Sequence, residues 1–227
     1  MNETSILKEK TSIDVKVITK QISNVIYIGI KRLIDILISL IGLIILSPLF
    51  LIIIILIKQE DHGHAFFVQE RIGKNGKNFK FYKFRSMITN ADEVLIEMIK
   101  DPKIEKEYKK NMKLSNDPRI TKIGLFIRKT SIDELPQLIN VLIGNMSLIG
   151  NRPYLPREKS DMGKYYDDII KTKPGITGYW QVSGRSKISF KDRCKLESYY
   201  SNNMNFLLDV KIFFKTFYVV LLGKGAE

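Results

Sequence analysis

The chain has 227 residues, and since a domain typically takes about 100–200, it has room for one globular domain beside its most apolar segment. Hydrophobic residues make up 44% of it, which excludes an intrinsically disordered chain, and its net charge of +13 favours phosphorylated ligands, anionic lipid headgroups or nucleic acid as partners. The single cysteine, Cys194, excludes an intrachain disulfide and suits a reducing compartment.

The chain begins with a polar extension, residues 1–30, which we predict to be mobile or loosely helical. Residues 36–57 follow without a single charge. As a helix at about 1.5 Å per residue, this segment would be about 33 Å long, which matches the roughly 30 Å hydrocarbon core of a bilayer. Residues 31–58 are therefore predicted to anchor the protein in a membrane.

Two features of this anchor disfavour a straight span. Pro48 lies near its middle, where a proline costs an unbroken helix about 3 kcal/mol, and Ser47 beside it can satisfy a freed backbone group. Basic residues flank both ends, Lys31 and Arg32 before it and Lys58 after it, so the positive-inside tendency places both ends in the cytosol. A helix-break-helix hairpin in one leaflet meets both constraints. Because kinked spans also tolerate prolines, the residues alone leave both topologies open.

After the anchor, the pattern predicts a small α+β domain that is mainly α. Alternating residues at 65–70 and 79–84 indicate two short strands, joined in a hairpin by a Gly- and Asn-containing turn. The apolar stretch 206–222 is predicted either to lie as an amphipathic helix in the membrane interface or to pack in the core. Helical periodicity is found at residues 91–99, 120–128, 133–143, 156–170 and 190–202.

Two adjacent carboxylates, Asp133 and Glu134, follow a pair of basic residues that includes Arg128. Ser131 and Glu134 have the spacing of a capping box, and for this segment by itself capping is the favoured interpretation. The alternative is catalytic, because adjacent carboxylates can supply a nucleophile and a divalent-metal ligand for phosphoryl transfer. Both interpretations stay open at this point.

Further basic residues point to a phosphate site. Lys80, Lys83 and Arg85 lie on the second strand, where they could face a pyrophosphate while aromatic residues pack beneath. Arg152 lies in a turn that a following proline restricts. A loop with glycines, tyrosine and tryptophan ends at Arg185, as a nucleotide pocket would. Each of these signals is weak by itself.

In chain order the informative segments are KRLID at residues 31–35, SP at 47–48, FFVQERIG at 66–73, YKFRSM at 82–87, DPRIT at 117–121, DELPQ at 133–137 and KPGITG at 173–178. Together they resemble the bacterial sugar transferase family, the monotopic polyprenyl-phosphate phosphoglycosyl transferases, in its minimal form. The resemblance covers residues 30–224. It implies a re-entrant membrane hairpin at residues 31–58 that breaks at Ser47 and Pro48. A cytosolic phosphoglycosyl transferase domain, residues 59–227, with interfacial amphipathic helices would follow at the bacterial cytoplasmic membrane.

The resemblance also implies a reaction. A sugar 1-phosphate passes from a UDP-sugar to polyprenyl (undecaprenyl) phosphate with release of UMP, and Mg²⁺ is required. Asp133 would attack the phosphate nearest the sugar and carry the phosphosugar covalently, while Glu134 would assist and both would hold the metal. The substrate-binding residues implied are Lys83, Arg85, Arg128, Arg152 and Arg185.

Some details of the sequence bear on substrate and partners. Asn151 stands where the family has the first proline of the Arg152 turn, and an asparagine can form a side-chain turn instead. The sequence WQVSGRS at residues 180–186 resembles members that handle hexose 1-phosphates, which suggests galactose or glucose. The product would enter an exopolysaccharide, capsule or other glycan. A second copy of the chain and downstream glycosyltransferases are possible partners, and nucleic acid is not expected.

Two rival hypotheses remain. A membrane-tethered regulatory or nucleic-acid-binding module would use the basic charge, which supports nonspecific binding, but would not need the adjacent carboxylates. Alternatively, the lipid phosphate could attack the donor directly in a ternary complex, with no covalent step on Asp133.

Overall fold

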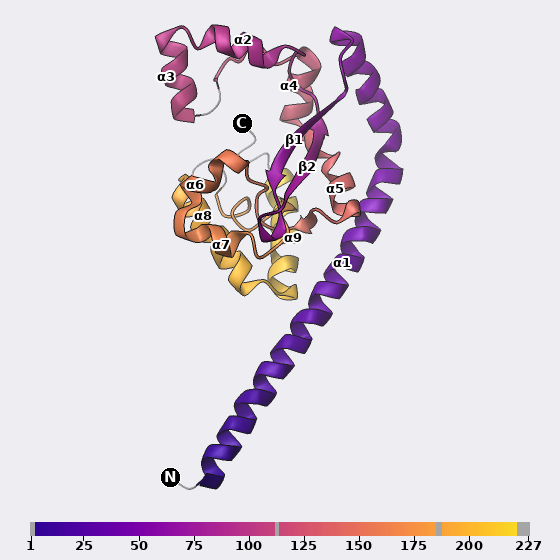
Figure 1. Cartoon of the computed structure of the whole chain (residues 1–227). Helices are drawn as coiled ribbons and strands as arrows, with labels where there is room; N and C mark the ends of the chain where they lie inside the picture. The colour runs from indigo at the N-terminus through magenta and orange to yellow at the C-terminus, as the bar shows by residue number, and fades with distance from the viewer. Residues whose placement is uncertain (1–2, 112–113, 185–187, 222–227) are drawn as a thin grey trace.

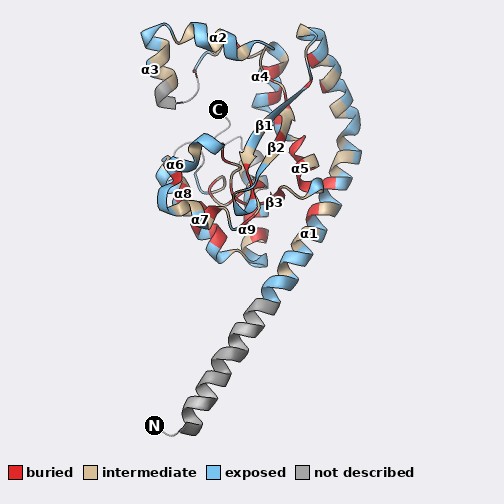
Figure 2. Cartoon of the chain, viewed as in Figure 1, coloured by how far each residue is buried: buried red, intermediate tan, exposed pale blue. Residues whose placement is uncertain are grey.

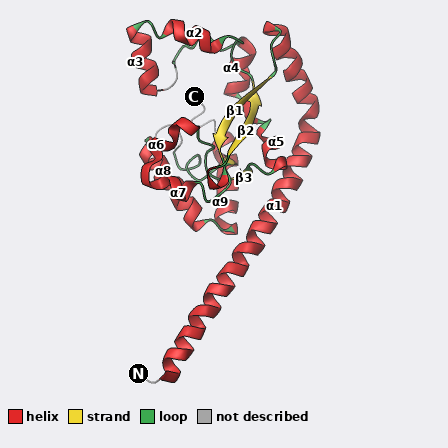
Figure 3. Ribbon diagram, viewed as in Figure 1, coloured by secondary structure: helices red, strands yellow, loops and turns green. Residues whose placement is uncertain are grey.

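A computed structural model describes residues 3–111, 114–184 and 188–221, and the side chains within 23–108, 114–184 and 188–219. The helices predicted at residues 91–99, 120–128 and 190–202 are confirmed, and Figure 3 shows the expected mainly helical α+β fold. The helices are α1 Glu3–Asp61, α2 Ala91–Met98, α3 Pro102–Asn111, α4 Lys122–Lys129, α5 Gln137–Ile143, α6 Lys159–Met162, α7 Tyr166–Ile169, α8 Phe190–Asn203 and α9 Phe206–Leu221. The strands are β1 Phe66–Ile72, β2 Asn78–Phe84, β3 Ser147–Ile149 and β4 Gly175–Thr177, and the 3₁₀ turns are η1 Lys74–Gly76, η2 Ile132–Glu134, η3 Pro156–Glu158 and η4 Gly163–Tyr165.

Helix α1 corrects one expectation about the N-terminal part of the chain. The polar extension is helical from residue 3, which is one of the two states predicted for it, whereas the predicted break at Ser47 and Pro48 is absent, because α1 continues through both (Figure 1). Pro48 frees the carbonyl of Ile44, and the Ser47 hydroxyl donates to that carbonyl at 2.8 Å. This hydrogen bond reduces the cost of the proline, and the helix continues through it. The membrane topology stays a prediction.

The globular domain lies alongside the C-terminal half of α1, and polar contacts tie it to the helix before the apolar segment (Figure 1). The Lys31 ammonium and the Tyr27 hydroxyl donate to Oδ2 of Asp209 in α9, at 2.5 Å and 2.7 Å. The buried Asp35 accepts a hydrogen bond from the backbone N–H of Leu148 in β3, at 2.9 Å.

The same domain also binds the chain at the other end of the apolar segment. Glu60 accepts from the backbone N–H of Lys122 at 2.7 Å, at the N-terminus of α4, where a carboxylate is favoured. Asp61 forms an ion pair with Arg85 just after β2. Both ends of the apolar segment are therefore attached to one domain.

Between these ends, α1 presents apolar side chains to the outside. Residues 23–61 form a helix that is long and apolar enough to cross a membrane, and in its most apolar window, of mean hydropathy 3.3, only 11% of the residues are buried. Figure 2 shows exposed residues along its outer face. A core helix of a soluble protein would bury these side chains, so the exposed face indicates membrane association. The exposed residues include Leu37, Ile41, Ile44, Ile45, Leu51 and Ile52.

The predicted hairpin is confirmed as β1 and β2, whose register decides which side chains share a face. Phe67 pairs with Lys83 and Arg71 pairs with Phe79, so these four side chains lie on one face. Lys80 is three positions from Lys83 on the same strand and therefore points to the opposite face. The expectation that these two lysines face a phosphate together is wrong.

Two apolar clusters hold the hairpin in place. Phe84 packs with Ile53 of α1 and Ile127 of α4, and all three are 2% exposed or less. On the other side of β2, Phe81 packs with the buried Val141 of α5. The hairpin is thus wedged between α1, α4 and α5, which brings β2 next to the turn that joins α4 to α5.

Other predicted elements differ from the structure. The helix predicted at residues 156–170 is divided into η3, α6, η4 and α7, because Gly163 adopts a positive φ of +51° that ends α6. The helix predicted at 133–143 begins as the η2 turn, and α5 starts only after Pro136. The parallel pair of β3 and β4 was missed, since strands of three residues are too short to show alternation.

Helix α9 combines the two alternatives considered for the C-terminal stretch. Asp209 and Ile212 are buried against the domain, whereas Phe206, Phe214 and Phe217 are more than half exposed. One face of α9 therefore belongs to the core, and the opposite face carries aromatic side chains that suit a membrane interface.

Candidate active site

Asp133 and Glu134 lie on the η2 turn between α4 and α5. Ser131 begins this turn with a left-handed φ of +57°, and its side chain makes no capping hydrogen bond. The capping-box interpretation is wrong, because an N-cap residue needs an extended backbone for its hydroxyl to reach the first helical amides. The turn leaves Asp133 buried at 7% exposure and Glu134 exposed. The carboxylates are therefore not consumed by helix capping.

Lys83 faces Asp133 from the hairpin. Its Nζ lies 3.9 Å from Oδ2 of Asp133. The fully buried Asn140 of α5 sets this geometry: its amide donates to the carbonyl of Lys80 at 2.6 Å, and its Oδ1 accepts from the N–H of Tyr82 at 3.0 Å. Asn140 thus bonds α5 to the edge of β2 beside Lys83, a role that no local sequence pattern indicates.

Burial and neighbouring charges act in opposite directions on the pKa values of Asp133 and Lys83. Burial raises the pKa of Asp133, and the positive charges of Lys83 and Arg128 counteract that rise. Burial lowers the pKa of Lys83, and Asp133 counteracts that fall. The pKa of Glu134 is raised first by desolvation, although the residue reaches the surface, and then by the negative charge of Asp133. The positive charges of Lys83 and Arg152 lower this pKa. Each ionised group thus depends on its neighbours of opposite charge.

The turn after β3 contains Arg152, and hydrogen bonds attach this turn to α8. The backbone N–H of Arg152 donates to Oε1 of Glu197 at 2.7 Å, and Glu197 is fully buried. Asn151 donates to Oγ of Ser201 at 2.6 Å and to the carbonyl of Ile169 at 3.1 Å. Buried hydrogen bonds therefore restrain the turn at Asn151, where the resemblance implies a proline.

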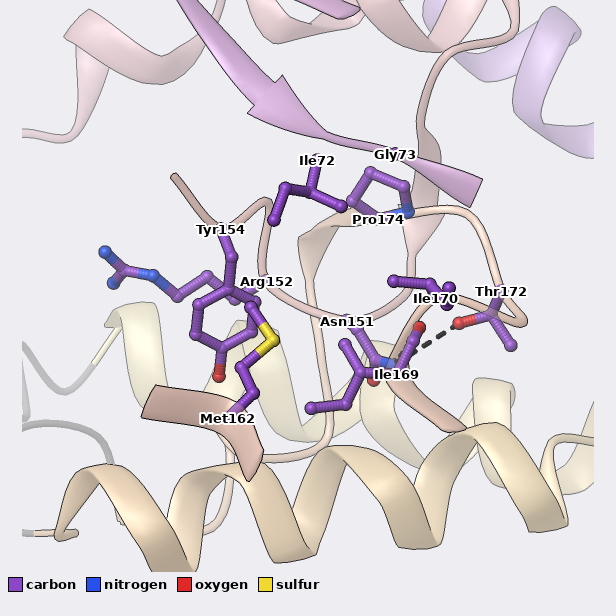
Figure 4. Close-up of a pocket in the computed structure, with 10 residues that line it drawn as sticks. All are labelled: Ile72, Gly73, Asn151, Arg152, Tyr154, Met162, Ile169, Ile170, Thr172 and Pro174. Carbon is purple, nitrogen blue, oxygen red and sulfur yellow. Dashed lines mark hydrogen bonds between the residues drawn. The ribbon is translucent and has the colours of Figure 1, made fainter. Parts of the chain in front are cut away.

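Figure 4 shows Asn151 within a small cavity and the guanidinium of Arg152 directed away from it. This cavity is about 10 Å³, far below the roughly 300 Å³ that a ligand pocket needs. A wider groove of about 520 Å³ lies along α8 between Tyr179 and Tyr199. Neither cavity is lined by Asp133 or Glu134, so the converging charged side chains define the candidate site.

The buried carboxyl group of Glu197 should make the free energy of unfolding depend on pH. Burial raises its pKa from 4.5 to about 7, while the Tyr154 hydroxyl and the Arg152 amide limit the rise. The folded protein thus holds this proton more tightly than the unfolded chain, so the free energy of unfolding should fall by up to about 3 kcal/mol as the pH rises from 5 to 8. Glu197→Gln keeps an acceptor for Arg152 and should remove this contribution, which thermal unfolding across that pH range would measure.

The exposed Glu93→Gln on α2 is the matched control and should retain the wild-type pH dependence. Equal slopes of the melting temperature against pH for wild type and Glu197→Gln would contradict the assigned titration.

One of the predicted substrate-binding residues, Arg85, has its partners away from this cluster. The guanidinium of Arg85 forms an ion pair with Asp61 and donates to the carbonyl of His64 at 2.6 Å, so it links the hairpin to the end of α1. That pairing holds the pKa of Asp61 below its usual range. Arg185 lies outside the described residues. Lys83, by contrast, lies 3.9 Å from Asp133, and the positive charges of Arg128 and Arg152 oppose the rise in the pKa of Asp133 and of Glu134, respectively.

The carboxylate pair also bears on metal binding. Among the described residues, no group of three or more His, Cys, Asp or Glu side chains could enclose a metal ion. Mg²⁺ is commonly bound by one or two carboxylates together with substrate phosphates, so Asp133 and Glu134 fit that mode. The raised pKa of each carboxyl agrees with this fit, because a cation beside them would stabilise their ionised forms.

The chain is similar in sequence to several bacterial proteins. An uncharacterized sugar transferase of Haemophilus influenzae is 47% identical over 198 residues, which are 87% of this chain and 42% of that protein. The undecaprenyl-phosphate galactose phosphotransferase of Salmonella typhimurium is 47% identical over 201 residues, covering 87% of this chain and 41% of that protein. The exopolysaccharide production protein ExoY of Sinorhizobium fredii is 42% identical over 197 residues, covering 86% and 87%.

The chain therefore spans less than half the length of the first two relatives and most of the third. The bacterial sugar transferase family description matches residues 10–223, which include the anchor, the hairpin and both carboxylates. By this match over nearly its whole length, the chain belongs to the bacterial sugar transferase family.

Proposed function

We propose that the protein transfers a sugar 1-phosphate from a UDP-sugar to polyprenyl (undecaprenyl) phosphate and releases UMP, by way of a covalent intermediate on Asp133. The observation that carries this proposal is the buried Asp133, 3.9 Å from Lys83, in a chain of this family. The name of the Salmonella relative supports the acceptor, and it favours galactose over glucose as the sugar. The name of the Sinorhizobium relative supports a role in exopolysaccharide synthesis, with capsule or another glycan as alternatives.

The chemistry proceeds in two displacements. A carboxylate oxygen of Asp133 attacks the phosphorus nearest the sugar, a new P–O bond forms, and the bond to the UMP phosphate breaks, so UMP leaves with the electron pair. An oxygen of the polyprenyl phosphate then attacks the same phosphorus and displaces Asp133. Lys83, Arg128 and Arg152 stabilise the negative charge that develops on the phosphoryl oxygens in both steps. Mg²⁺ held by Asp133 and Glu134 would neutralise further charge on the donor diphosphate.

The anchor would hold this site at the level of a lipid phosphate. Contacts of Lys31 with Asp209 and of Asp61 with Arg85 attach both ends of the apolar segment to one domain. A domain that stays in the cytosol would keep both ends on the cytosolic side of the bacterial cytoplasmic membrane. This supports a bent, re-entrant insertion over a span, and proximity to the membrane surface would orient the lipid substrate for attack.

The proposal is tested with purified protein, Mg²⁺, undecaprenyl phosphate and a panel of UDP-sugars that includes UDP-galactose and UDP-glucose. Release of UMP with formation of a lipid-linked sugar is the expected result. No UMP release from any donor would reject the enzyme hypothesis and favour the regulatory or nucleic-acid-binding module. Trapping of a phosphosugar on the protein without acceptor distinguishes the covalent route from the ternary complex.

Lys83→Met should lower the rate of UMP release by about 10²-fold or more, the usual cost of losing one charge-stabilising group. The loss of positive charge should also raise the pKa of Asp133, so the acidic limb of the pH–rate profile should move to higher pH. Lys80→Met on the opposite face of β2 is the control and should stay close to wild type. Equal losses in both variants would place the effect in the strand and not in the site.

A further inference from the structure

A second basic side chain of the hairpin lies on the same face as Lys83. Arg71 pairs with Phe79 across the strands, while Lys83 pairs with Phe67, and the alternation of a strand puts both cations on one side. The guanidinium of Arg71 lies over the ring of Phe81, 5.2 Å from its centroid. Arg71 therefore points toward the side of the hairpin that holds Asp133.

The guanidinium of Arg71 is held in a defined position. It donates to the carbonyl of Pro153 at 3.0 Å and to Oε1 of Gln69 at 2.7 Å. Because Pro153 follows Arg152 directly, the first bond joins the hairpin to the turn that presents Arg152. A side chain with this many restraints loses little conformational entropy when it binds a ligand.

Arg71 is partly buried, and the positive charge of Arg152 acts on it. The pKa of Arg71 is lowered to about 10, mainly by burial and next by the positive charge of Arg152. The negative charges of Glu158 and Glu134 act in the opposite direction and raise this pKa. Glu158 is already used, because it accepts from the backbone N–H of Leu155 at 2.6 Å. The hydrogen bond to Pro153 places Arg71 beside the Arg152 turn, and the shared face of the hairpin places it on the side of Lys83, whose Nζ lies 3.9 Å from Asp133.

The hydrogen-bonding capacity of Arg71 and Arg152 is not used up by the protein. The Nε atoms of Arg71 and Arg152 are both buried and have no acceptor among the described residues. Buried donors of this kind are rare in folded proteins. Guanidiniums with unused donors match the planar geometry and the charge of phosphate oxygens.

We propose that Arg71, together with Arg152, binds the phosphate oxygens of the sugar donor's diphosphate. This assignment rests on the proposed function, because it needs a nucleotide-sugar donor. It adds a substrate-binding residue from β1, opposite the strand that supplies Lys83. The diphosphate then lies between the hairpin and the Arg152 turn, with Asp133 on the same side.

Binding of UDP and of uridine to the full chain in lipid nanodiscs, with Mg²⁺ present, tests the proposal. Arg71→Gln should weaken UDP binding about tenfold to a hundredfold, the cost of losing hydrogen bonds to a charged group. The affinity for uridine, which has no phosphate, should not change, and neither should the KM for undecaprenyl phosphate. Arg157→Gln, an exposed arginine of η3 whose charge also reaches Arg71, is the control and should bind UDP like wild type.

Three results would overturn the assignment while the proposed function stands. Unchanged UDP affinity in Arg71→Gln is the first. An equal loss for UDP and uridine is the second, because it would show that Arg71 only supports the Arg152 turn. A rise in the KM for the lipid acceptor with unchanged UDP affinity is the third. If wild type binds no UDP and releases no UMP from any UDP-sugar, the proposed function fails and this assignment fails with it.

Discussion

Asp133→Asn should reduce UMP release by at least about 10³-fold, as expected for removal of a nucleophile. The amide has nearly the same shape but cannot form the bond to phosphorus. Because Asp133 is 7% exposed and burial raises its pKa, removal of its charge should leave the melting temperature unchanged or higher. A loss of activity without a loss of stability would separate a chemical role from a structural one.

The exposed Asp167→Asn on α7 is the matched control, since it makes the same chemical change on the surface of the same domain. It should retain wild-type turnover. Incubation of wild type with a UDP-sugar in the absence of lipid should add the mass of one phosphosugar, and Asp133→Asn should add none. Near-normal turnover in Asp133→Asn would instead favour direct attack in a ternary complex.

Asp209→Ala should be the most destabilising single substitution that we predict. Asp209 accepts hydrogen bonds from Lys31 at 2.5 Å, from Tyr27 at 2.7 Å and from Tyr200 at 2.7 Å, and it is 7% exposed. Its removal leaves a partly buried ammonium without a partner, which costs about 3–5 kcal/mol. For a chain of this length the melting temperature should fall by about 10 °C, which thermal unfolding in nanodiscs would measure.

Asp209→Asn keeps an acceptor for the two tyrosines and should be less harmful than Asp209→Ala. Lys211→Ala changes an exposed residue of the same helix and should be neutral. In a double-mutant cycle, Lys31→Met should recover part of the stability lost in Asp209→Ala, because the unpaired charge is then gone. Additive losses would show that the ion pair does not couple α1 to α9.

Local sequence singled out the candidate site residues Asp133, Glu134, Lys83 and Arg152, because they occur in segments that resemble the family. The structure places Lys83 beside Asp133, and the roles of all four stay predictions. Arg85 was assigned to the substrate, yet its partner is Asp61 at the end of α1. The identity of an arginine's partner depends on which helix packs against its strand, and no local pattern encodes that.

The supporting residues were missed for the same reason. Asn140 meets a strand about 60 residues before it, and Glu197 meets a turn about 45 residues before it. Each is a single polar residue in a helical pattern, where a solvent-facing side chain is the ordinary expectation. The backbone of Ser131 is a similar case, since its left-handed conformation differs from the extended one that the capping spacing predicts.

By itself the sequence determined the apolar segment, the β1–β2 hairpin, helices α2, α4 and α8, and the family. These follow from periodicity, charge and turn residues, which act over a few positions. The tertiary structure alone decided that α1 continues through Pro48, that Arg71 joins Lys83 on one face, and that Glu197 fixes the Arg152 turn. These depend on contacts between distant segments, whose free energy is gained only when the whole domain packs.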